Sequence, residues 1–293
     1  MNILLLSGGY TEREVSLMSG NEVKDSLLRI GHKVTKIDIS KNEFLNLSLD
    51  NFDLVFNALH GGIGENGVIQ SICEFKNIPY TGSPVLPSSV AMNKALAKKV
   101  FESVNINIAE SIVSNIYELK NKEPFKRPFI IKPIDGGSSL GVNIIYKQTL
   151  LNELKFNDRK FLVEDYIEGK EVAVAVLNNK VLGMIEIKFE ENFYDYKSKY
   201  ESSKTEYVIP EDLSQKQKYL LENFALSAHI TLGCKGVTRS DFIVPKEESL
   251  KPVMLEINTL PGLTKHSLVP KIAKNNELSF DNLITKIIED ALV

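Results

Sequence analysis

The chain has 293 residues, of which 43% are hydrophobic and 25% are charged, and its formal net charge is −3. These values indicate a globular protein of two or three subdomains and disfavour a general nucleic-acid binder, which would be basic. Two cysteines are too few for a disulfide framework, no apolar run reaches the roughly 18 residues of a membrane span, and the N-terminus lacks the basic start of a signal peptide. We therefore expect a cytoplasmic protein without a membrane or nucleic-acid partner.

The first 60 residues alternate strand and helix patterns. Residues 2–6 form an apolar run that leads into a glycine pair, and residues 12–30 carry apolar side chains at helical spacing. Residues 33–39 and 54–59 have the pattern of two further strands. Strand, helix and strand joined by short links predict a βαβ unit and therefore a parallel sheet. The G-x-G-x-x-G fingerprint is absent, which disfavours a nicotinamide cofactor.

A glycine-rich loop follows the third of these strands, where residues 60–67 contain His60 and four glycines. Ligand crevices of open α/β sheets lie at the carboxyl ends of strands, and glycines allow the backbone to approach a ligand closely. A structural role for His60 is the alternative, but its position favours a role in a site. His32 and His229 lie in or beside helical segments and are expected to be structural, whereas His266 has no assignable role.

The pattern changes near residues 80–84, and residues 90–104 predict one helix. This helix carries Lys94, Lys98 and Lys99. Lysines on a helix usually form a solvated face, and Lys94 lies one turn from Lys98. We therefore expect only one of them to turn inward.

Residues 127–133 predict a strand that carries Lys132 within an otherwise apolar run. A buried lysine on a strand is rare unless it meets an anion. The following loop, residues 134–142, is rich in glycine and serine, so its N–H groups could surround phosphate oxygens. It is not a Walker A loop, because no Gly-Lys-Ser/Thr sequence closes it.

Two further segments have less specific patterns. Residues 161–171 combine an apolar stretch with several carboxylates, which fits either the adenosine part of a nucleotide or a charged hairpin. Residues 193–210 are polar and aromatic without apolar periodicity, and we interpret them as a lid. Residues 213–230 and 278–292 predict helices.

Near its end the chain places oxygen ligands on two predicted strands. Residues 236–244 carry Arg239 and Asp241, two positions apart and therefore on one side. The apolar run 252–255 leads to Glu256 and Asn258, which also share a face. Two carboxylates and an amide oxygen suit Mg²⁺, although a polar edge strand is the alternative. A fixed arginine beside them fits phosphoryl chemistry.

The order of these features resembles the D-alanine–D-alanine ligases of the ATP-grasp superfamily, over essentially the whole chain. The motifs that carry the resemblance are residues 12–20, 60–67, 80–83, 132–141, 194–200 and 256–270. The resemblance implies an α/β fold of three subdomains. These are an N-terminal Rossmann-like parallel sheet over residues 1–88, and the central and C-terminal parts of an ATP-grasp α+β fold over residues 89–168 and 169–293.

The resemblance also implies the reaction. Two D-alanine molecules would be joined at the expense of ATP through an acyl phosphate, releasing ADP and phosphate, for peptidoglycan precursors in cell wall synthesis. Two Mg²⁺ ions, or Mn²⁺ in their place, would assist, and the protein would be a homodimer. Arg239 and the Gly262 N–H would stabilise the oxyanion. Glu12 would hold the first substrate's ammonium group, and His60 would lie near its carboxylate.

The implied site residues fall into four groups. The catalytic group is Glu12, Ser138, Tyr200, Arg239 and Gly262. The substrate-binding group is His60, Lys199, Ser267 and Leu268. The ATP-binding group is Lys94, Lys132, Gly137, Ser139, Glu164, Ile167 and Glu171, of which the last three would hold adenine and ribose. The metal ligands are Asp241, Glu256 and Asn258.

Some positions depart from the family pattern. Asp135-Gly136 makes the start of the glycine loop more acidic and richer in glycine than the family pattern, and the extra acid near the phosphates would alter ATP affinity. Asn66 stands where aspartate is usual. In the family, a tyrosine at the position of Tyr200 accompanies D-alanine as second substrate, whereas phenylalanine accompanies D-lactate.

Two alternative functions stay open. One is a ligase that joins D-alanine to D-serine or D-lactate, and the other is an ATP-binding scaffold without activity.

Overall fold

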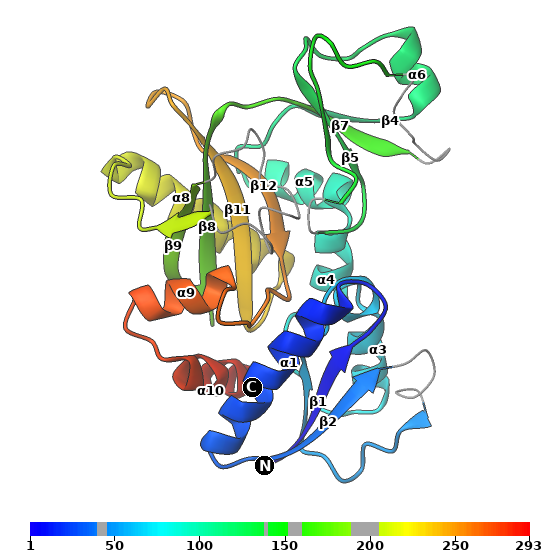
Figure 1. The fold of residues 1–293 in the computed structure, drawn as a ribbon, viewed down its shortest axis with the longest axis vertical. Helices are drawn as coiled ribbons and strands as arrows, with labels where there is room; N and C mark the ends of the chain where they lie inside the picture. Colours follow the sequence, from blue (N-terminus) through cyan, green and yellow to red (C-terminus); the bar gives the residue numbers. More distant parts are fainter. Residues whose placement is uncertain (40–45, 138–139, 152–159, 189–204) are drawn as a thin grey trace.

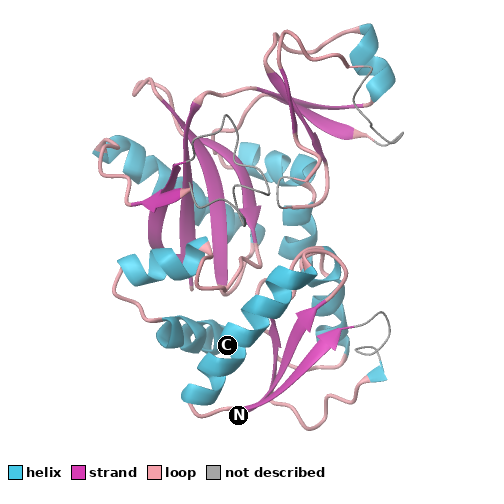
Figure 2. Cartoon of the chain, viewed as in Figure 1, coloured by secondary structure: helices cyan, strands magenta, loops and turns pink. Residues whose placement is uncertain are grey.

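A computed structural model describes residues 1–39, 46–137, 140–151, 160–188 and 205–293 of the chain (Figure 1). Three sheets lie in these described parts, each with helices packed against it (Figure 2). The mixed α/β architecture agrees with the expected fold class. Four expected site residues lie outside the described residues, as does most of the expected lid: Ser138, Ser139, Lys199 and Tyr200.

The N-terminal sheet is parallel, as its βαβ pattern predicts. Its strands are β1 (Asn2–Gly8), β2 (Lys33–Ile39) and β3 (Leu54–Asn57), in the order β2-β1-β3. Helix α1 (Arg13–Arg29) connects the first two strands. It ends because Gly31 adopts a left-handed φ of 88°. That conformation lets the His32 N–H reach the Leu27 carbonyl at 3.0 Å, which satisfies a terminal carbonyl of the helix.

The single helix expected over residues 90–104 is wrong. The chain forms the 3-10 turn η1 (Gly62–Gly64) and helices α3 (Val68–Phe75), α4 (Val85–Met92) and α5 (Lys94–Ser103). Between α4 and α5, Asn93 leaves the helical region at φ −93° and ψ 97°. Its side-chain oxygen accepts the Leu96 N–H at 3.0 Å and thereby caps α5. Asparagine is among the best N-cap residues, and this local bond outcompetes helix continuation.

The central sheet is antiparallel and has a small core of its own. Its strands are β4 (Ser111–Ser114), β5 (Phe129–Pro133), β6 (Asn143–Ile145) and β7 (Phe161–Asp165), in the order β4-β7-β5-β6. Helix α6 (Ile116–Asn121) packs beside it. Phe129, Ile131 and Val163 are fully buried in this core. Lys132 and Glu164 are therefore delivered by rigid neighbouring strands.

The C-terminal sheet is antiparallel and is covered on both faces. Its strands are β8 (Gly169–Leu177), β9 (Lys180–Lys188), β10 (Glu206–Val208), β11 (Val237–Pro245) and β12 (Val253–Asn258), in the order β10-β9-β8-β11-β12. The C-terminal half also contains helices α8 (Gln215–Leu232), α9 (Leu268–Asn275) and α10 (Phe280–Ala291).

Strand β8 shows how two hydrophobic cores are divided by side-chain alternation. Val172, Val174 and Val176 belong to the core that includes α8. Ala173 and Ala175 point the other way, into a core that includes α9, α10, α1 and the N-terminal sheet. Figure 1 shows α10 beside α1, where Arg29 and Asp281 form an ion pair at 2.6 Å. The N-terminal and C-terminal parts thus share one core, and the boundaries expected after residues 88 and 168 stay predictions.

His229 on α8 is structural, as expected. Its ring is fully buried, and Nδ1 lies 2.8 Å from the Thr238 hydroxyl. Burial lowers the pKa of His229 from 6.5 to about 4, although Asp290 opposes the shift. None of the described helices is long and apolar enough to cross a membrane.

This pKa predicts a pH dependence of stability. Below pH 6.5 the unfolded chain takes up a proton at His229 that the folded chain resists down to about pH 4. The free energy of unfolding is therefore highest, as far as His229 determines it, above pH 6.5. It decreases as the pH falls, by roughly 2 kcal/mol between pH 7 and pH 5. The free energy of unfolding, measured with urea at pH 7 and pH 5, should decrease between these pH values in wild type. In His229→Gln this decrease should be smaller by this amount. The exposed His266→Gln variant should keep the wild-type decrease, and equal decreases in all three proteins would contradict the assignment.

Candidate active site

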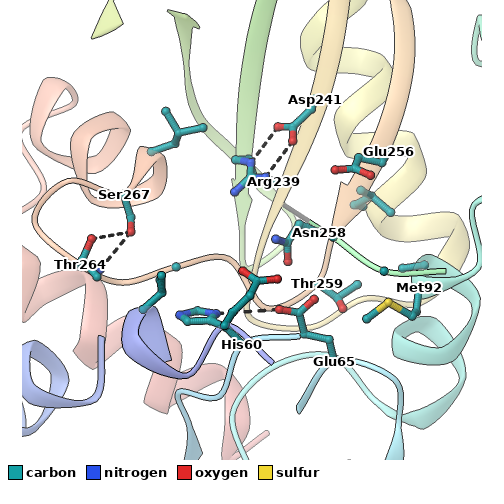
Figure 3. Close-up of a pocket in the computed structure, with 18 of the residues that line it drawn as sticks. His60, Glu65, Met92, Arg239, Asp241, Glu256, Asn258, Thr259, Thr264 and Ser267 are labelled. Atoms are coloured by element: carbon teal, nitrogen blue, oxygen red, sulfur yellow. Dashed lines mark hydrogen bonds and ion pairs between the residues drawn. The ribbon is translucent and has the colours of Figure 1, made fainter. Parts of the chain in front are cut away.

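Two adjoining cavities lie between the three sheets and contain most of the expected site residues. Figure 3 shows the larger of the two. The larger cavity is lined from the N-terminal part by Glu12 and His60, and from the C-terminal part by residues that include Arg239, Gly262 and Ser267. The smaller is lined by residues that include Lys132 and Glu164. The two share Lys94, Gly136, Gly137, Glu171, Asp241 and Glu256. Of the expected site residues that the structure describes, only Ile167 lines neither cavity.

Strands β11 and β12 place the expected metal ligands side by side. Asp241 lies directly opposite Glu256 in the antiparallel register, and Arg239 lies opposite Asn258. A register shift follows Asp241, and such bulges often re-aim side chains beside active sites. The Asn258 side-chain oxygen accepts the Leu260 N–H at 2.9 Å, which fixes its orientation and leaves one lone pair.

Each of the two carboxylates has a cation beside it. The Arg239 guanidinium contacts Asp241 through two bonds, Nε–Oδ1 at 2.7 Å and Nη2–Oδ2 at 2.8 Å (Figure 3). Lys94 Nζ lies 3.3 Å from Glu256 Oε2. The donor set of two carboxylates and an amide oxygen fits Mg²⁺. The described residues contain no group of three or more His, Cys, Asp or Glu side chains suited to a metal, so the third protein ligand would have to be Asn258.

A buried group of charges lies beside the smaller cavity. Glu164 contacts Lys132 Nζ at 2.7 Å through one oxygen and Lys98 Nζ at 2.8 Å through the other. Burial alone would raise the pKa of Glu164, but the ammonium groups of Lys132 and Lys98 outweigh it and hold the pKa below its usual value. Burial lowers the pKa of Lys98 although Glu164 opposes the shift.

The expectation that only one helix lysine turns inward is wrong. Both Lys94 and Lys98 turn inward, whereas Lys99 remains 76% exposed. Residues four apart lie on one helix face, and that face of α5 is covered by strands that supply Glu164 and Glu256. The partner carboxylates are distant in sequence, so helix periodicity could not show them.

The N-terminal part supplies Glu12 and His60. Glu12 precedes α1 in a left-handed conformation, with φ 49° and ψ 32°, which is uncommon outside glycine and typical of functional sites. His60 Nε2 lies 2.9 Å from the buried Ser19 hydroxyl. Its Nδ1 lies 3.9 Å from Glu65 Oε1 (Figure 3). Ser19 also accepts the Leu263 N–H at 3.4 Å, so it links His60 to the turn after β12.

That turn carries the expected oxyanion and carboxylate-binding residues. The Ser267 hydroxyl is held by Thr264, whose N–H lies at 3.1 Å and whose hydroxyl lies at 2.8 Å. Helix α9 begins at Leu268, so its N-terminal N–H groups lie at the cavity. A Cβ atom at Gly262 would approach the Ser267 hydroxyl to 2.8 Å, so a side chain there would displace Ser267.

Three further residues touch the site although the sequence motifs predict no site role for them: Lys98, Ser19 and Glu65. Lys98 could have been found from its spacing of one helical turn from Lys94. Ser19 and Glu65 lie in motifs that carry the family resemblance, but a serine or a glutamate alone does not indicate a partner. Their roles depend on contacts with His60 and the Gly61 N–H, which only the folded chain shows.

The three sheets, with cavities lined by lysines, glycines and paired carboxylates, define the ATP-grasp class of ligases. The family model for the D-ala D-ala ligase C-terminus matches residues 94–289, and that for the N-terminus matches residues 42–83. D-alanine–D-alanine ligase of Pelagibacter ubique is 45% identical, covering 99% of this chain and 98% of its own length, and that of Chelativorans sp. is 41% identical, covering 99% and 97%.

Solved structures give the same result. The D-alanine–D-alanine ligase of Bacillus anthracis complexed with ATP aligns with a TM-score of 0.84 at 30% identity, covering 100% of this chain and 97% of that chain. The VanG D-Ala:D-Ser ligase of Enterococcus faecalis aligns with a TM-score of 0.83 at 28% identity, covering 99% of each chain. The chain belongs to the D-alanine–D-alanine ligase family.

Proposed function

We propose that this protein joins two D-alanine molecules to D-alanyl-D-alanine with ATP, for the synthesis of peptidoglycan precursors. One observation carries the proposal. The cavity that contains Glu12 and His60 is continuous with the residues expected to bind phosphate and metal, including Lys94, Asp241 and Glu256. An amino acid held by the N-terminal part would therefore meet the reactive end of a nucleotide. Family membership over the full chain supports the same activity.

Lys94 and Lys132 would bind the phosphates of ATP, and the N–H groups around Gly137 would surround them. Glu164, Ile167 and Glu171 would hold adenine and ribose. Asp241, Glu256 and Asn258 would hold Mg²⁺, which neutralises phosphate charge when bound. Arg239 and Lys94 already neutralise the two carboxylates in this structure, so metal binding would displace these ion pairs or share their oxygens.

The chemistry would proceed in two displacements. The carboxylate of the first D-alanine attacks the γ-phosphorus, ADP leaves, and an acyl phosphate forms. The ammonium group of the second D-alanine loses a proton, and the resulting amine attacks the acyl carbon. The nitrogen then loses a second proton, and phosphate leaves with the C–O bonding pair. Arg239 and the Gly262 N–H would stabilise the oxyanion of the tetrahedral intermediate. Glu12 and His60 would orient the first substrate, and Ser267 with the start of α9 would bind the second carboxylate.

Steady-state release of ADP, measured with purified protein, Mg²⁺ and candidate amino acids, tests this function. We expect release with D-alanine alone and D-alanyl-D-alanine as the product by mass spectrometry. The likeness to a D-Ala:D-Ser ligase makes D-serine the second candidate for the nucleophile. Release only after D-serine or D-lactate is added would replace the proposal, and ATP binding without release would indicate an inactive binding protein.

We further propose that the protein is a homodimer and acts in the cytoplasm, where ATP is available. The family resemblance supports the dimer. Light scattering during size-exclusion chromatography would give the mass in solution, and a mass near the 32.9 kDa of one chain would contradict it.

A further inference from the structure

Two buried lysines share one buried carboxylate at the inner end of the smaller cavity. Lys98 on α5, Glu164 on β7 and Lys132 on β5 have side chains that are only 3%, 2% and 8% exposed. Each lysine contacts a different oxygen of Glu164, at 2.8 Å and 2.7 Å. Lys98 also donates to the Ala109 carbonyl at 3.0 Å, which fixes it to the segment before β4. The group therefore carries two positive charges and one negative charge away from water.

The two lysines differ in their access to the cavity. Lys132 lines the cavity, whereas Lys98 lines neither cavity and contacts it only through Glu164. Glu102, one turn further along α5, also attracts Lys98, but its side chain is 49% exposed, so solvent screens its charge. Lys98 is thus held between a carbonyl and a carboxylate, and it does not contact a ligand in either cavity directly.

The contact between Lys132 and Glu164 has a consequence for phosphate binding. In the proposed function, Lys132 Nζ turns from Glu164 towards a phosphate oxygen when ATP binds. A carboxylate that loses its cation in a buried site is strongly destabilised, because neither water nor another charge compensates it. With Lys98 in place, Glu164 keeps a cation at 2.8 Å and remains compensated.

We propose that Lys98 is a positioning residue for ATP binding: it is the permanent counter-ion of Glu164 and so frees Lys132 to bind phosphate. The inference rests on the proposed function, in which Lys132 contacts ATP. Without Lys98, Lys132 and Glu164 form a closed one-to-one ion pair that ATP must break. With Lys98, ATP only replaces one of two cations.

The test is the affinity of the full chain for ATP with Mg²⁺, measured by calorimetry without D-alanine. Lys98→Met should weaken ATP binding roughly 10- to 100-fold, the range for one hydrogen bond to a charged group. Lys99→Met removes the same charge from the exposed neighbouring position and should bind ATP within about twofold of wild type. The KM for D-alanine should stay unchanged in both variants.

The same substitution in a Glu164→Gln variant distinguishes the role of Lys98 as counter-ion from a general loss of charge or of structure. In Glu164→Gln no carboxylate holds Lys132, so adding Lys98→Met should change ATP affinity by no more than about twofold. If Lys98→Met weakens ATP binding equally in both backgrounds, or not at all in wild type, the inference is overturned. Should thermal unfolding show that Lys98→Met is not folded, Lys98→Gln, which keeps a hydrogen-bond donor without the charge, is measured with the same expectation.

The outcome for the wild-type protein keeps the two proposals apart. A wild type that neither binds ATP nor releases ADP overturns the proposed function, and the inference with it. A wild type that binds ATP and forms D-alanyl-D-alanine, while Lys98→Met binds ATP equally well, overturns the inference alone.

Discussion

Glu256→Gln should reduce turnover by roughly a thousandfold, the upper range for removing one electrostatic contact from a preorganised site. Glutamine has nearly the same shape as glutamate but no charge. The substitution removes one of two carboxylates that lie opposite each other on β11 and β12, and it leaves Lys94 without its partner at 3.3 Å. Mg²⁺ would then have one charged ligand, Asp241, which itself is bonded to Arg239.

The coupled ADP-release assay measures the turnover, and Mn²⁺ binding measured by electron paramagnetic resonance reports the metal site directly. Glu248→Gln is the matched control, because it is the same substitution at an exposed position beyond β11. The control should retain both activity and Mn²⁺ binding. Near-normal turnover in Glu256→Gln would show that this carboxylate is not a metal ligand.

Arg239→Lys should lower kcat by roughly a hundredfold and change the KM for ATP less. Lysine keeps the charge but cannot form the two parallel bonds, at 2.7 Å and 2.8 Å, that hold Arg239 against Asp241. The cation would no longer be fixed where the oxyanion develops, and fixed donors of this kind contribute about 10²–10³ to kcat. A loss expressed mainly in kcat distinguishes stabilisation of the transition state from substrate binding.

Arg29→Lys provides the comparison for this variant. Arg29 forms an equivalent two-bond contact with Asp281, at 3.0 Å and 2.6 Å, but neither residue lines either cavity. Arg29→Lys should leave kcat unchanged and change stability only slightly, because the ion pair is exposed to solvent. Equal kcat in Arg239→Lys and wild type would remove Arg239 from the proposed mechanism.

The regular elements were predictable because their patterns are local. The strand at 33–39 and the helix over α1 follow from side-chain periodicity, and the helix ends at a glycine with a left-handed φ. The break between α4 and α5 was not predictable, because the apolar periodicity continues through Asn93. There a single side-chain hydrogen bond to Leu96, rather than hydrophobic pattern, decides where one helix ends and the next begins.

The amino-acid sequence by itself determined the family, the parallel direction of the N-terminal strands and the residue types of the site. Sequence motifs retain the chemistry of a site even when its members are far apart in the chain. The tertiary structure alone decided which charges are partners. Lys98 and Lys132 meet on Glu164, and Ser19 meets His60, because the fold brings together residues that are more than 30 positions apart in the chain. Electrostatic partners depend on distances of a few ångströms, which sequence spacing does not specify between elements.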